Sequence, residues 1–331
     1  MANPIFALVG SESLLGREVR DLAAAAPALD LRLIAADEEE PGTLTRMGDQ
    51  PAVISGLDAE ALSDTRAVIL AGSPESSAKA LELAAVPVID LTNTAEERPE
   101  ARLRAPLVGD GADDEANGAT IHVIAHPAAI ALALFLNRLH SRDPIRQSVI
   151  QILAPASEHG AKAVEELQNQ TVSLFSFKSL PQKIFDAQLG FNLLARYGEE
   201  APVSLEDSEL RIERHLATLL ARPDEDTPAP FPSLRLVQAP VFHGYSFSAW
   251  VDFDETPDIE ALEEALVSPL VEVRGRDFDP PTNVGQAGQG GVAVGAITPD
   301  RNRATACWFW LVADNLRLAA ENAIAVAREM L

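Results

Sequence analysis

A turn bounded by two glycines near the start of the chain could bind phosphate groups. It covers residues 10–16 (GSESLLG) and joins an apolar run at residues 5–10 to a helical pattern at residues 15–26. In a strand–turn–helix unit, such glycines let a dinucleotide pyrophosphate approach backbone N–H groups at a helix N-terminus. However, Ser13 stands at the middle glycine position, and the Glu12 carboxylate would repel a phosphate unless it points outward. The turn therefore fits either a nucleotide loop or an ordinary tight connection.

Four consecutive acids follow the second apolar run, at Asp37, Glu38, Glu39 and Glu40. An acid at the end of this strand can accept a hydrogen bond from a ribose 2′-hydroxyl, whereas a 2′-phosphate requires arginine or lysine. The sequence therefore disfavours the phosphorylated dinucleotide, if a dinucleotide binds. A solvated acidic loop in an acidic protein explains these residues equally well.

The single cysteine, Cys307, lies in a hydrophobic run (ATACWFWLVA) next to Trp308. One cysteine excludes a disulfide framework and a zinc site with several thiolates. A cysteine in such a run is typical of a small buried hydrophobic residue rather than a reactive thiol. The apolar surroundings of Trp250, Trp308 and Trp310 predict core or a dimer interface.

The elements that position these residues change character along the chain. The first part alternates apolar runs with helical patterns, which is typical of a parallel sheet covered on both faces. Its predicted strands are residues 5–10, 31–36, 67–72, 86–90 and 121–125, and its helices are residues 15–26, 75–85 and 128–140. Later runs partly alternate, which predicts an antiparallel or mixed sheet with one open face. These strands are residues 147–155, 233–242, 247–253, 270–275, 291–298 and 304–313, with helices at 161–170, 205–220, 259–266 and 315–331.

Composition limits the classes of protein to which the chain can belong. Its 331 residues suggest two domains, at about 100–200 residues per domain. A formal net charge of −24 leaves no overall basic surface for nucleic acid. No run reaches the roughly 20 apolar residues of a spanning helix, and the N-terminus lacks the basic region of a secretory signal. The sequence predicts a cytoplasmic, soluble protein without nucleic-acid or membrane partners.

The order of the motifs resembles the aspartate-β-semialdehyde dehydrogenase family over nearly the whole chain. Each motif is modest by itself, whereas their order and spacing are specific. The first matching segments are LVGSESLLGREV (8–19), LRLIAADE (31–38), AVILAGSPESSAKA (67–80) and VPVIDLTN (86–93). The later ones are AHPAAI (125–130), AVEELQNQT (163–171), GFNLL (190–194), APVFHGYS (239–246) and LVADNLRLAAENA (311–323).

This resemblance implies an α/β fold with two domains. A Rossmann-type nucleotide-binding domain would cover residues 1–127 and 315–331, completed by the C-terminal helix, and a mixed-sheet domain at 128–314 would form a homodimer. The family reduces aspartyl phosphate to aspartate semialdehyde with NADPH, through a cysteine thioester, in amino-acid biosynthesis. The positions that would bind NAD or NADP here are Gly10, Ser11, Glu12, Ser13, Leu14, Leu15, Gly16, Ala36, Asp37, Gly72, Ser73 and Asn315.

The same resemblance identifies the positions at which thioester chemistry would require particular groups. It needs a thiolate nucleophile, a base, a side-chain amide and an arginine for the substrate carboxylate. Those positions hold Ala129 for the cysteine, Ala154 for the glutamine, Gln238 for the arginine and Tyr245 for the histidine, and a family glutamate falls near His215. Alanine cannot attack an acyl phosphate, and loss of a nucleophile costs orders of magnitude in rate. The chain therefore resembles a cysteine-less, catalytically degenerate branch of the family.

Other side chains near these segments leave alternatives open. His126, His159 and His243 flank the segments that form the family's active site, so a repurposed metal or anion site is one interpretation. No carboxylate is designated beside them, which favours structural histidines and no metal. Tyr245 or Ser246 could act as a general acid or nucleophile, but neither has an obvious neighbouring base in the sequence.

Two functions follow from these residues. The first is a homodimeric, non-catalytic relative that keeps the scaffold and has a binding or regulatory role, with a small molecule or an active paralogue as partner. The alternative is an NAD(P)-dependent oxidoreductase of the same family that transfers hydride directly to a carbonyl, without a thioester.

Overall fold

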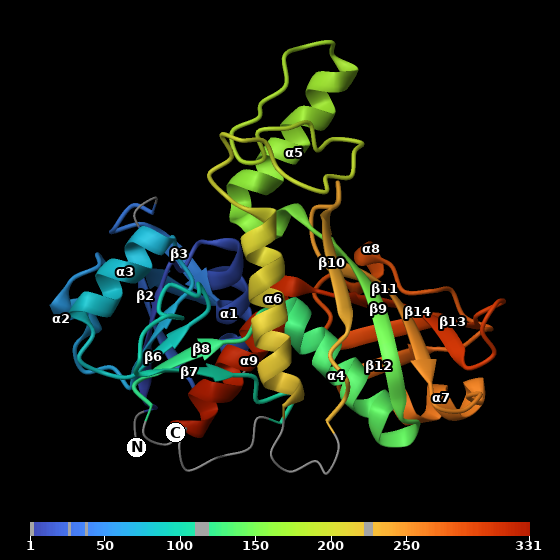
Figure 1. Ribbon diagram of the computed structural model, residues 1–331. Helices are drawn as coiled ribbons and strands as arrows, with labels where there is room; N and C mark the ends of the chain where they lie inside the picture. Colours follow the sequence, from blue (N-terminus) through green and yellow to red (C-terminus); the bar gives the residue numbers. More distant parts are fainter. Residues whose placement is uncertain (1–2, 26–27, 37–38, 110–118, 222–227) are drawn as a thin grey trace. The chain divides into compact units, whose positions relative to one another are not determined.

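The alternating runs in the first part of the chain form a six-stranded parallel sheet in the structure, which is a computed structural model (Figure 1). The structure describes residues 3–25, 28–36, 39–109, 119–221 and 228–331. The chain divides into unit 1, Met1–Ala125 with Ala319–Leu331, and unit 2, His126–Leu318. Each unit has its own six-stranded sheet.

The sheet of unit 1 has the strand order β2-β1-β5-β6-β8-β7, with every pairing parallel. Its strands are β1 (Ile5–Val9), β2 (Asp30–Ile34), β5 (Ala67–Leu70), β6 (Val88–Asp90), β7 (Ala101–Arg104) and β8 (Ile121–Ile124). Ala7 and Val9 belong to a core cluster that includes Leu62 of α2 (Ala59–Leu62) and Ala80 of α3 (Pro74–Leu83). Alternate residues of β1 are fully buried as well, so the strand is covered on both faces, as its continuous apolar run predicts.

The C-terminal helix α9 (Asn315–Glu329) begins in unit 2 and ends in unit 1. In unit 1 the Glu329 carboxylate pairs with Arg104 at 2.7 Å, and Asn322 Oδ1 accepts the Leu107 N–H at 3.2 Å. These contacts fix the last part of α9 within unit 1. Unit 1 also contains α1 (Leu14–Ala24) and a hairpin that the sequence did not predict, formed by β3 (Leu44–Met47) and β4 (Gln50–Val53).

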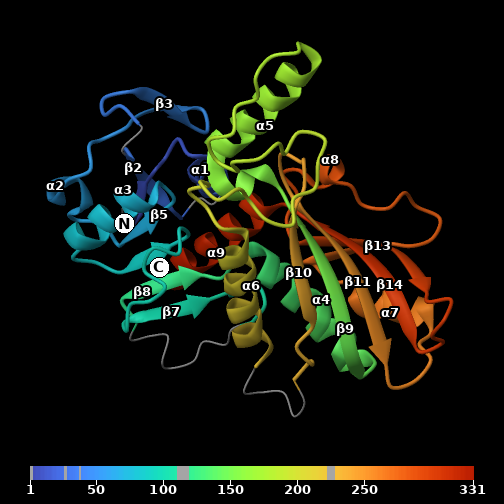
Figure 2. The ribbon, with the colours of Figure 1, turned by 45° about the horizontal axis from the view of Figure 1, so that its top comes forward.

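The sheet of unit 2 is mixed, as predicted, with the order β10-β9-β11-β14-β13-β12 (Figure 2). Its strands are β9 (Ile145–Ala154), β10 (Ser233–Gln238), β11 (Tyr245–Phe253), β12 (Val271–Arg274), β13 (Val292–Pro299) and β14 (Ala306–Ala313). β9 runs parallel to β10 and β12 runs parallel to β13, whereas the three inner pairings are antiparallel.

Helix α4 (Pro127–Arg142) packs against β9 and β13 and is buried along most of its length. The other helices of unit 2 are η2 (Ala156–His159), α5 (Gly160–Phe175), α6 (Leu205–Leu220), α7 (Ile259–Leu266) and α8 (Asn283–Gln286). Helices α6 and α7 contact α4 and the outer strands, so these three helices line one face of the sheet. Side chains pointing the other way are more exposed: Val149 is 53% exposed and Trp308 is 43% exposed. The alternation along β9 and β14 therefore reflects one covered and one open face.

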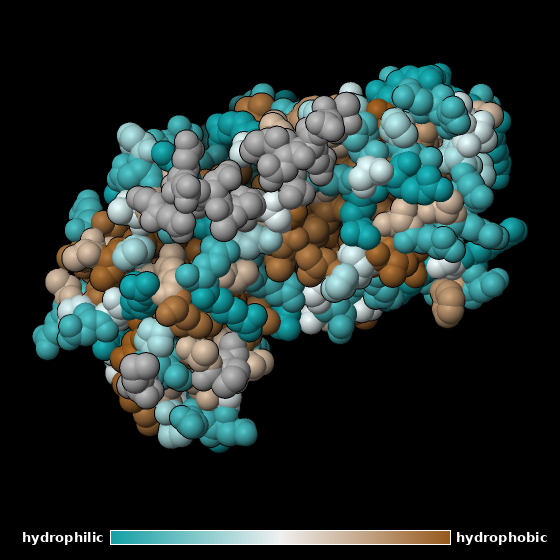
Figure 3. Space-filling view, turned by 90° about the horizontal axis from the view of Figure 1, so that it is seen from below, coloured by the Kyte–Doolittle hydropathy of each residue, from teal (hydrophilic) through white to brown (hydrophobic). Residues whose placement is uncertain are grey.

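The surface of the protein mixes hydrophilic and hydrophobic residues (Figure 3), and its single cysteine is buried. On the face shown in Figure 3, hydrophobic patches of different sizes lie between hydrophilic residues. Cys307 of β14 is 1% exposed, which confirms that the single thiol belongs to the core. Within the described ranges, no helix combines the length and the apolar character needed to cross a bilayer.

Candidate functional site

The glycine turn of unit 1 is built by close backbone contact. Gly10 follows β1 with φ +83°, a conformation that favours glycine, and a Cβ there would collide with the backbone of Gly72 after β5. A Cβ at Gly16 would collide with the carbonyl oxygen of Gly10. These three glycines therefore bring the ends of two strands and the start of α1 into contact, as a nucleotide-binding turn requires.

Ser13, which stands at the expected middle glycine position, caps α1. Its Oγ accepts the Gly16 N–H at 2.8 Å and donates to the Ala71 carbonyl at 2.6 Å. A serine at the N-cap satisfies a backbone donor that would otherwise lack a partner. The adjacent Ser11 hydroxyl is fully buried and has no hydrogen-bond partner among the described residues. The turn thus keeps its shape although one glycine is missing.

The Glu12 carboxylate is directed toward cations and not into open solvent. It contacts Arg20 in an ion pair, accepts a hydrogen bond from Thr45 Oγ1 at 2.9 Å, and lies 3.2 Å from Arg17. Burial opposes ionisation, but these hydrogen bonds and the two guanidinium charges outweigh it and lower the pKa of Glu12. The negative charge that the sequence places in the turn is therefore locally neutralised.

Glu39 is the acid that reaches the turn from the segment after β2. Its Oε1 accepts the Glu12 N–H at 2.9 Å, and its Oε2 accepts the Ala36 N–H at 3.2 Å. Asp37, the sequence candidate for this role, and Glu38 lie outside the described residues. The Glu39 carboxylate therefore bridges the ends of β1 and β2.

The remaining nucleotide candidates are placed as follows. Ala36, Gly72 and Ser73 follow β2 and β5, beside the turn that leads into Leu14 and Leu15 of α1. Ser73 caps α3 by accepting the Ser76 N–H at 3.1 Å. Asn315 lies in unit 2, where its Oδ1 accepts hydrogen bonds from Ser157 Oγ at 3.1 Å and the Gly244 N–H at 3.0 Å.

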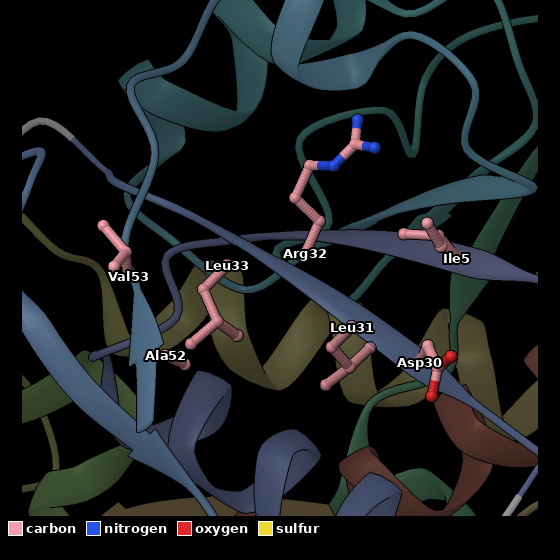
Figure 4. Close-up of a pocket in the computed structure, with 7 residues that line it drawn as sticks. All are labelled: Ile5, Asp30, Leu31, Arg32, Leu33, Ala52 and Val53. Atoms are coloured by element: carbon pink, nitrogen blue, oxygen red, sulfur yellow. The ribbon is translucent and has the colours of Figure 1, made fainter. Parts of the chain in front are cut away.

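A surface pocket lies beside the edge strand β2, away from these strand ends (Figure 4). In this view Arg32 points away from Leu31 and Leu33, and its guanidinium donates to the carbonyls of Ala61 and Ser63 at 2.8 Å. The lining residues are Ile5, Asp30, Leu31, Arg32, Leu33, Ala52 and Val53. Ligands of parallel sheets bind beyond the carboxyl ends of the strands, so this position does not favour a functional site.

In unit 2, three of the four positions that the sequence assigns to catalytic groups lie at the ends of the neighbouring strands β10, β9 and β11. Ala154 ends β9 and pairs with Gln238, the last residue of β10, while Tyr245 begins the antiparallel strand β11. Ala129 lies in the first turn of α4. All four are enclosed: Ala154 is 1% exposed and the other three are 0% exposed.

His126 and Glu158 form the centre of a polar cluster beside these strand ends. His126 Nε2 lies 2.8 Å from Glu158 Oε1, and the two side chains are 2% and 17% exposed. Burial opposes the charge of Glu158, but the charge and hydrogen bond of His126 lower its pKa from 4.5 to about 2. The backbone N–H of His126 donates to His215 Nδ1 at 2.8 Å, so the residue near the family's glutamate position supports the start of α4.

Tyr245 lies against this pair. Its ring packs edge-on to the His126 ring with 5.8 Å between centroids, and its hydroxyl has no partner in direct hydrogen-bond geometry among the described residues. Burial and the neighbouring Glu158 raise the pKa of Tyr245 well above 10. The sequence shows no base next to Tyr245, whereas the fold brings the Glu158 carboxylate near it from a distant segment.

A second chain of hydrogen bonds uses His159, Tyr197 and Gln238. The Tyr197 hydroxyl donates to Gln238 Oε1 at 2.8 Å and lies 2.8 Å from His159 Nε2. Because the hydroxyl has only one proton, His159 Nε2 must be the donor in that contact. Gln238 Nε2 donates to the carbonyls of Ala154 at 2.9 Å and Ala239 at 3.1 Å. Both the oxygen and the nitrogen of the Gln238 amide, at the expected arginine position, are therefore hydrogen-bonded within the protein.

We refer to His126, Glu158, His159, Tyr197, Gln238 and Tyr245 as the polar cluster. Burial lowers the pKa of His159, which favours its neutral form at neutral pH. Two of the three candidate histidines thus flank one carboxylate, which the sequence did not designate. The described part of the chain contains no group of three or more His, Cys, Asp or Glu side chains arranged to hold a metal ion.

Comparisons with known proteins agree on one family. A family model for the dimerisation domain of semialdehyde dehydrogenases matches residues 136–318, more than half of the chain. An aspartate-semialdehyde dehydrogenase from Rickettsia bellii is 27% identical, covering 98% of this chain and 97% of the relative. A USG-1 protein homolog from Pseudomonas aeruginosa is 28% identical over 87% of this chain and 86% of its own. The structure of a probable aspartate-semialdehyde dehydrogenase from Pseudomonas aeruginosa has a TM-score of 0.84 at 26% identity, covering 99% of this chain and 98% of that one.

Proposed function

This chain belongs to the semialdehyde dehydrogenase family, and on that basis we propose that it keeps the family's scaffold without forming a thioester, and acts as a binding or regulatory protein. The observation that carries this proposal is the state of the four catalytic positions. Ala129, Ala154, Gln238 and Tyr245 lack the required groups, and none is more than 1% exposed. A substrate carbonyl would find neither a nucleophile nor a way to reach one.

The loss at each position has a chemical consequence. Without a thiolate at Ala129, an acyl phosphate cannot be attacked by the protein, and the covalent intermediate does not form. Gln238 cannot replace an arginine fork, because its two amide hydrogens are already donated to Ala154 and Ala239 carbonyls. The groups that remain can support binding but not the family's reaction.

Direct hydride transfer to a carbonyl, the alternative function, would need an acid that reaches the substrate. Tyr245 is the candidate at the right edge of the sheet, but its hydroxyl is fully enclosed and the pKa of Tyr245 is raised well above 10. The geometry therefore favours the non-catalytic function over this alternative.

Self-association through the open face of the unit 2 sheet is part of the same proposal. Val149 and Trp308 are exposed there, and the indole N–H groups of Trp250 and Trp308 donate to Asp300 Oδ2 at 3.0 and 2.9 Å. The shared Asp300 carboxylate fixes both indole rings on a face that a second copy could cover. The matched dimerisation-domain model spans all six strands of this sheet.

The test is an assay of the pure protein with aspartate semialdehyde, inorganic phosphate and NADP or NAD. We expect no phosphate-dependent reduction of either nucleotide, and none after Ala129→Cys alone, because the base, the amide and the arginine are absent as well. Circular dichroism of both proteins serves as the control for folding. Turnover by the unmodified chain at ordinary enzyme rates would refute the proposal.

A further inference from the structure

The strand ends of unit 1 retain a cradle for the adenosine half of a dinucleotide. A Cβ at Gly10 would collide with the Gly72 backbone and one at Gly16 with the Gly10 carbonyl, so these glycines let the ends of β1 and β5 and the start of α1 approach closely. The buried Ser11 hydroxyl in this turn has no partner in the described residues. A backbone cradle with an unpaired hydroxyl fits a pyrophosphate and its ribose, so the residues present are compatible with the family's nucleotide.

The Glu39 carboxylate lies where such a nucleotide would place its adenosine ribose. It is held by two backbone donors, Glu12 N–H and Ala36 N–H, at the adjacent ends of β1 and β2. Glu39 is partly exposed, whereas Glu40 is exposed. In parallel nucleotide-binding sheets, an acid at the end of the second strand contacts the ribose hydroxyls.

The charges around the turn make this carboxylate the negative group that a ligand would meet. The Glu12 carboxylate is compensated by Arg17 and Arg20. Among the residues that the structure describes, Glu39 accepts only backbone hydrogen bonds and pairs with no cation. A carboxylate has about four acceptor positions, so two remain for a ligand's hydroxyl groups.

We propose that Glu39 makes the dinucleotide site of unit 1 selective for NAD over NADP. The ribose 2′-hydroxyl of NAD can donate to the Glu39 carboxylate, whereas a 2′-phosphate would bring like charges into contact, and the nearby Arg17 and Arg20 are already paired with Glu12. This inference deepens the proposed function, because it rests on unit 1 having kept a nucleotide site. The inference assigns the selectivity to one side chain, Glu39. The preferred nucleotide would be NAD, whereas the family resemblance implies NADPH.

Isothermal titration of the full chain with NAD and with NADP tests the proposal. The unmodified protein should bind NAD at least about tenfold more tightly than NADP, as expected for loss of one charge-assisted hydrogen bond. Glu39→Gln should weaken NAD binding, strengthen NADP binding and bring the two affinities within a few fold. Glu40→Gln, which removes the same charge one residue away, should leave the ratio unchanged.

Three results would overturn the proposal: NADP binding as tightly as NAD, a ratio that Glu39→Gln does not change, or no binding of either nucleotide at millimolar concentration. Amide hydrogen exchange in β1 and β2 shows that each variant is folded, so a lost heat signal cannot be mistaken for unfolding. Different results would refute the selectivity and the proposed function. Equal affinities for NAD and NADP would refute the selectivity even if the protein is inactive. Turnover of aspartate semialdehyde would refute the non-catalytic function without changing the ratio of the two affinities.

Discussion

The glycine turn of unit 1 and the polar cluster of unit 2 have diverged from the family in opposite ways. The turn has lost one glycine and gained two acids, but Ser13 caps the helix and Glu12 is paired, so its shape persists. In the cluster, Tyr197 donates a hydrogen bond to Gln238, and both side chains are bonded within the protein. The turn keeps its backbone shape, whereas the polar side chains of the cluster bond mainly to one another.

This difference separates two kinds of site. The turn is built from backbone, and its requirement is the absence of Cβ atoms at a few positions, which Gly10 and Gly16 still meet. The polar cluster is built from side chains, so under the proposed function the four substitutions would remove the family's reaction while the strands beneath them remain. Once a site no longer has to bind a substrate, its buried polar groups must find partners inside the protein, because an unpaired one costs about 1–3 kcal/mol. In the polar cluster, Glu158 is such a partner for His126, and Gln238 is one for Tyr197.

The largest expected effect is at Glu158, the centre of the cluster. Glu158→Gln should lower the free energy of unfolding of unit 2 by about 3 kcal/mol at neutral pH, because it removes the charged partner of buried His126. Tryptophan fluorescence in urea measures it, since all three tryptophans, Trp250, Trp308 and Trp310, lie in unit 2. Glu165→Gln on the exposed face of α5 is the matched control and should change stability by less than about 0.5 kcal/mol.

The same side chain predicts a pH dependence. The pKa of Glu158 is about 2 in the folded protein against an ordinary 4.5, so folding favours the ionised carboxylate. The ionised carboxylate makes its full contribution to the free energy of unfolding above pH 4.5. That contribution, about 3 kcal/mol, is lost as the pH falls toward 2. Glu158→Gln should remove this part of the acid dependence. Identical pH profiles for the variant and the unmodified chain would show that the pair is not a source of stability.

The next effect tests the turn as a backbone-built site. Gly16→Ala should destabilise unit 1 by about 2 kcal/mol, because its Cβ would collide with the Gly10 carbonyl. Amide exchange of β1 and β5 measures this locally. Gly56→Ala is the control, since its Cβ would meet only Pro41 side-chain atoms at 3.9 Å. Equal exchange rates in the two variants would mean that the turn tolerates a side chain and is not a preserved cradle.

A smaller effect is expected at Tyr197, where one hydroxyl links two other side chains. Tyr197→Phe should lower the stability of unit 2 by about 1–2 kcal/mol, because Gln238 Oε1 and His159 Nε2 each lose a partner at 2.8 Å. Urea unfolding followed by tryptophan fluorescence is again the measurement. A variant as stable as the unmodified protein would show that water replaces the hydroxyl, and that the cluster is less enclosed than its exposed fractions indicate.

Much of the fold could be predicted from the sequence because its signals are local. The run at Ile5–Val9 is apolar on both faces, and the structure places it inside a parallel sheet. The edge strand β7 (Ala101–Arg104, ARLR) was missed, because two arginines interrupt its apolar pattern. The partner of Arg104 is Glu329 of the C-terminal helix, which the local sequence cannot show. The β3–β4 hairpin was missed for a similar reason, since its side chains are mostly exposed and carry little hydrophobic pattern.

The site was only partly predictable, because its contacts are distant along the chain. The replacement of the family's groups at Ala129 and Gln238 could be read directly, but their enclosure could not. Glu158 lies 32 residues from His126, and Tyr197 lies 41 residues from Gln238. The one local signal was Glu158 beside His159, directly after the predicted end of β9. Pairing that carboxylate with two histidines and a tyrosine required the register of the sheet, which periodicity alone does not give.

The smallest expected effect is at Tyr245, and it decides whether that residue belongs to the network or merely fills space. Its hydroxyl is fully buried without a partner in direct hydrogen-bond geometry among the described residues, so Tyr245→Phe removes a polar group that gains nothing from burial. The stability of unit 2 should change by less than about 0.5 kcal/mol, or rise slightly. Tyr197→Phe, the same chemical change at a bonded hydroxyl, is the comparison. A loss of more than about 1 kcal/mol at Tyr245 would mean that its hydroxyl donates to Glu158, and that the former catalytic edge has retained a connected tyrosine–glutamate–histidine chain.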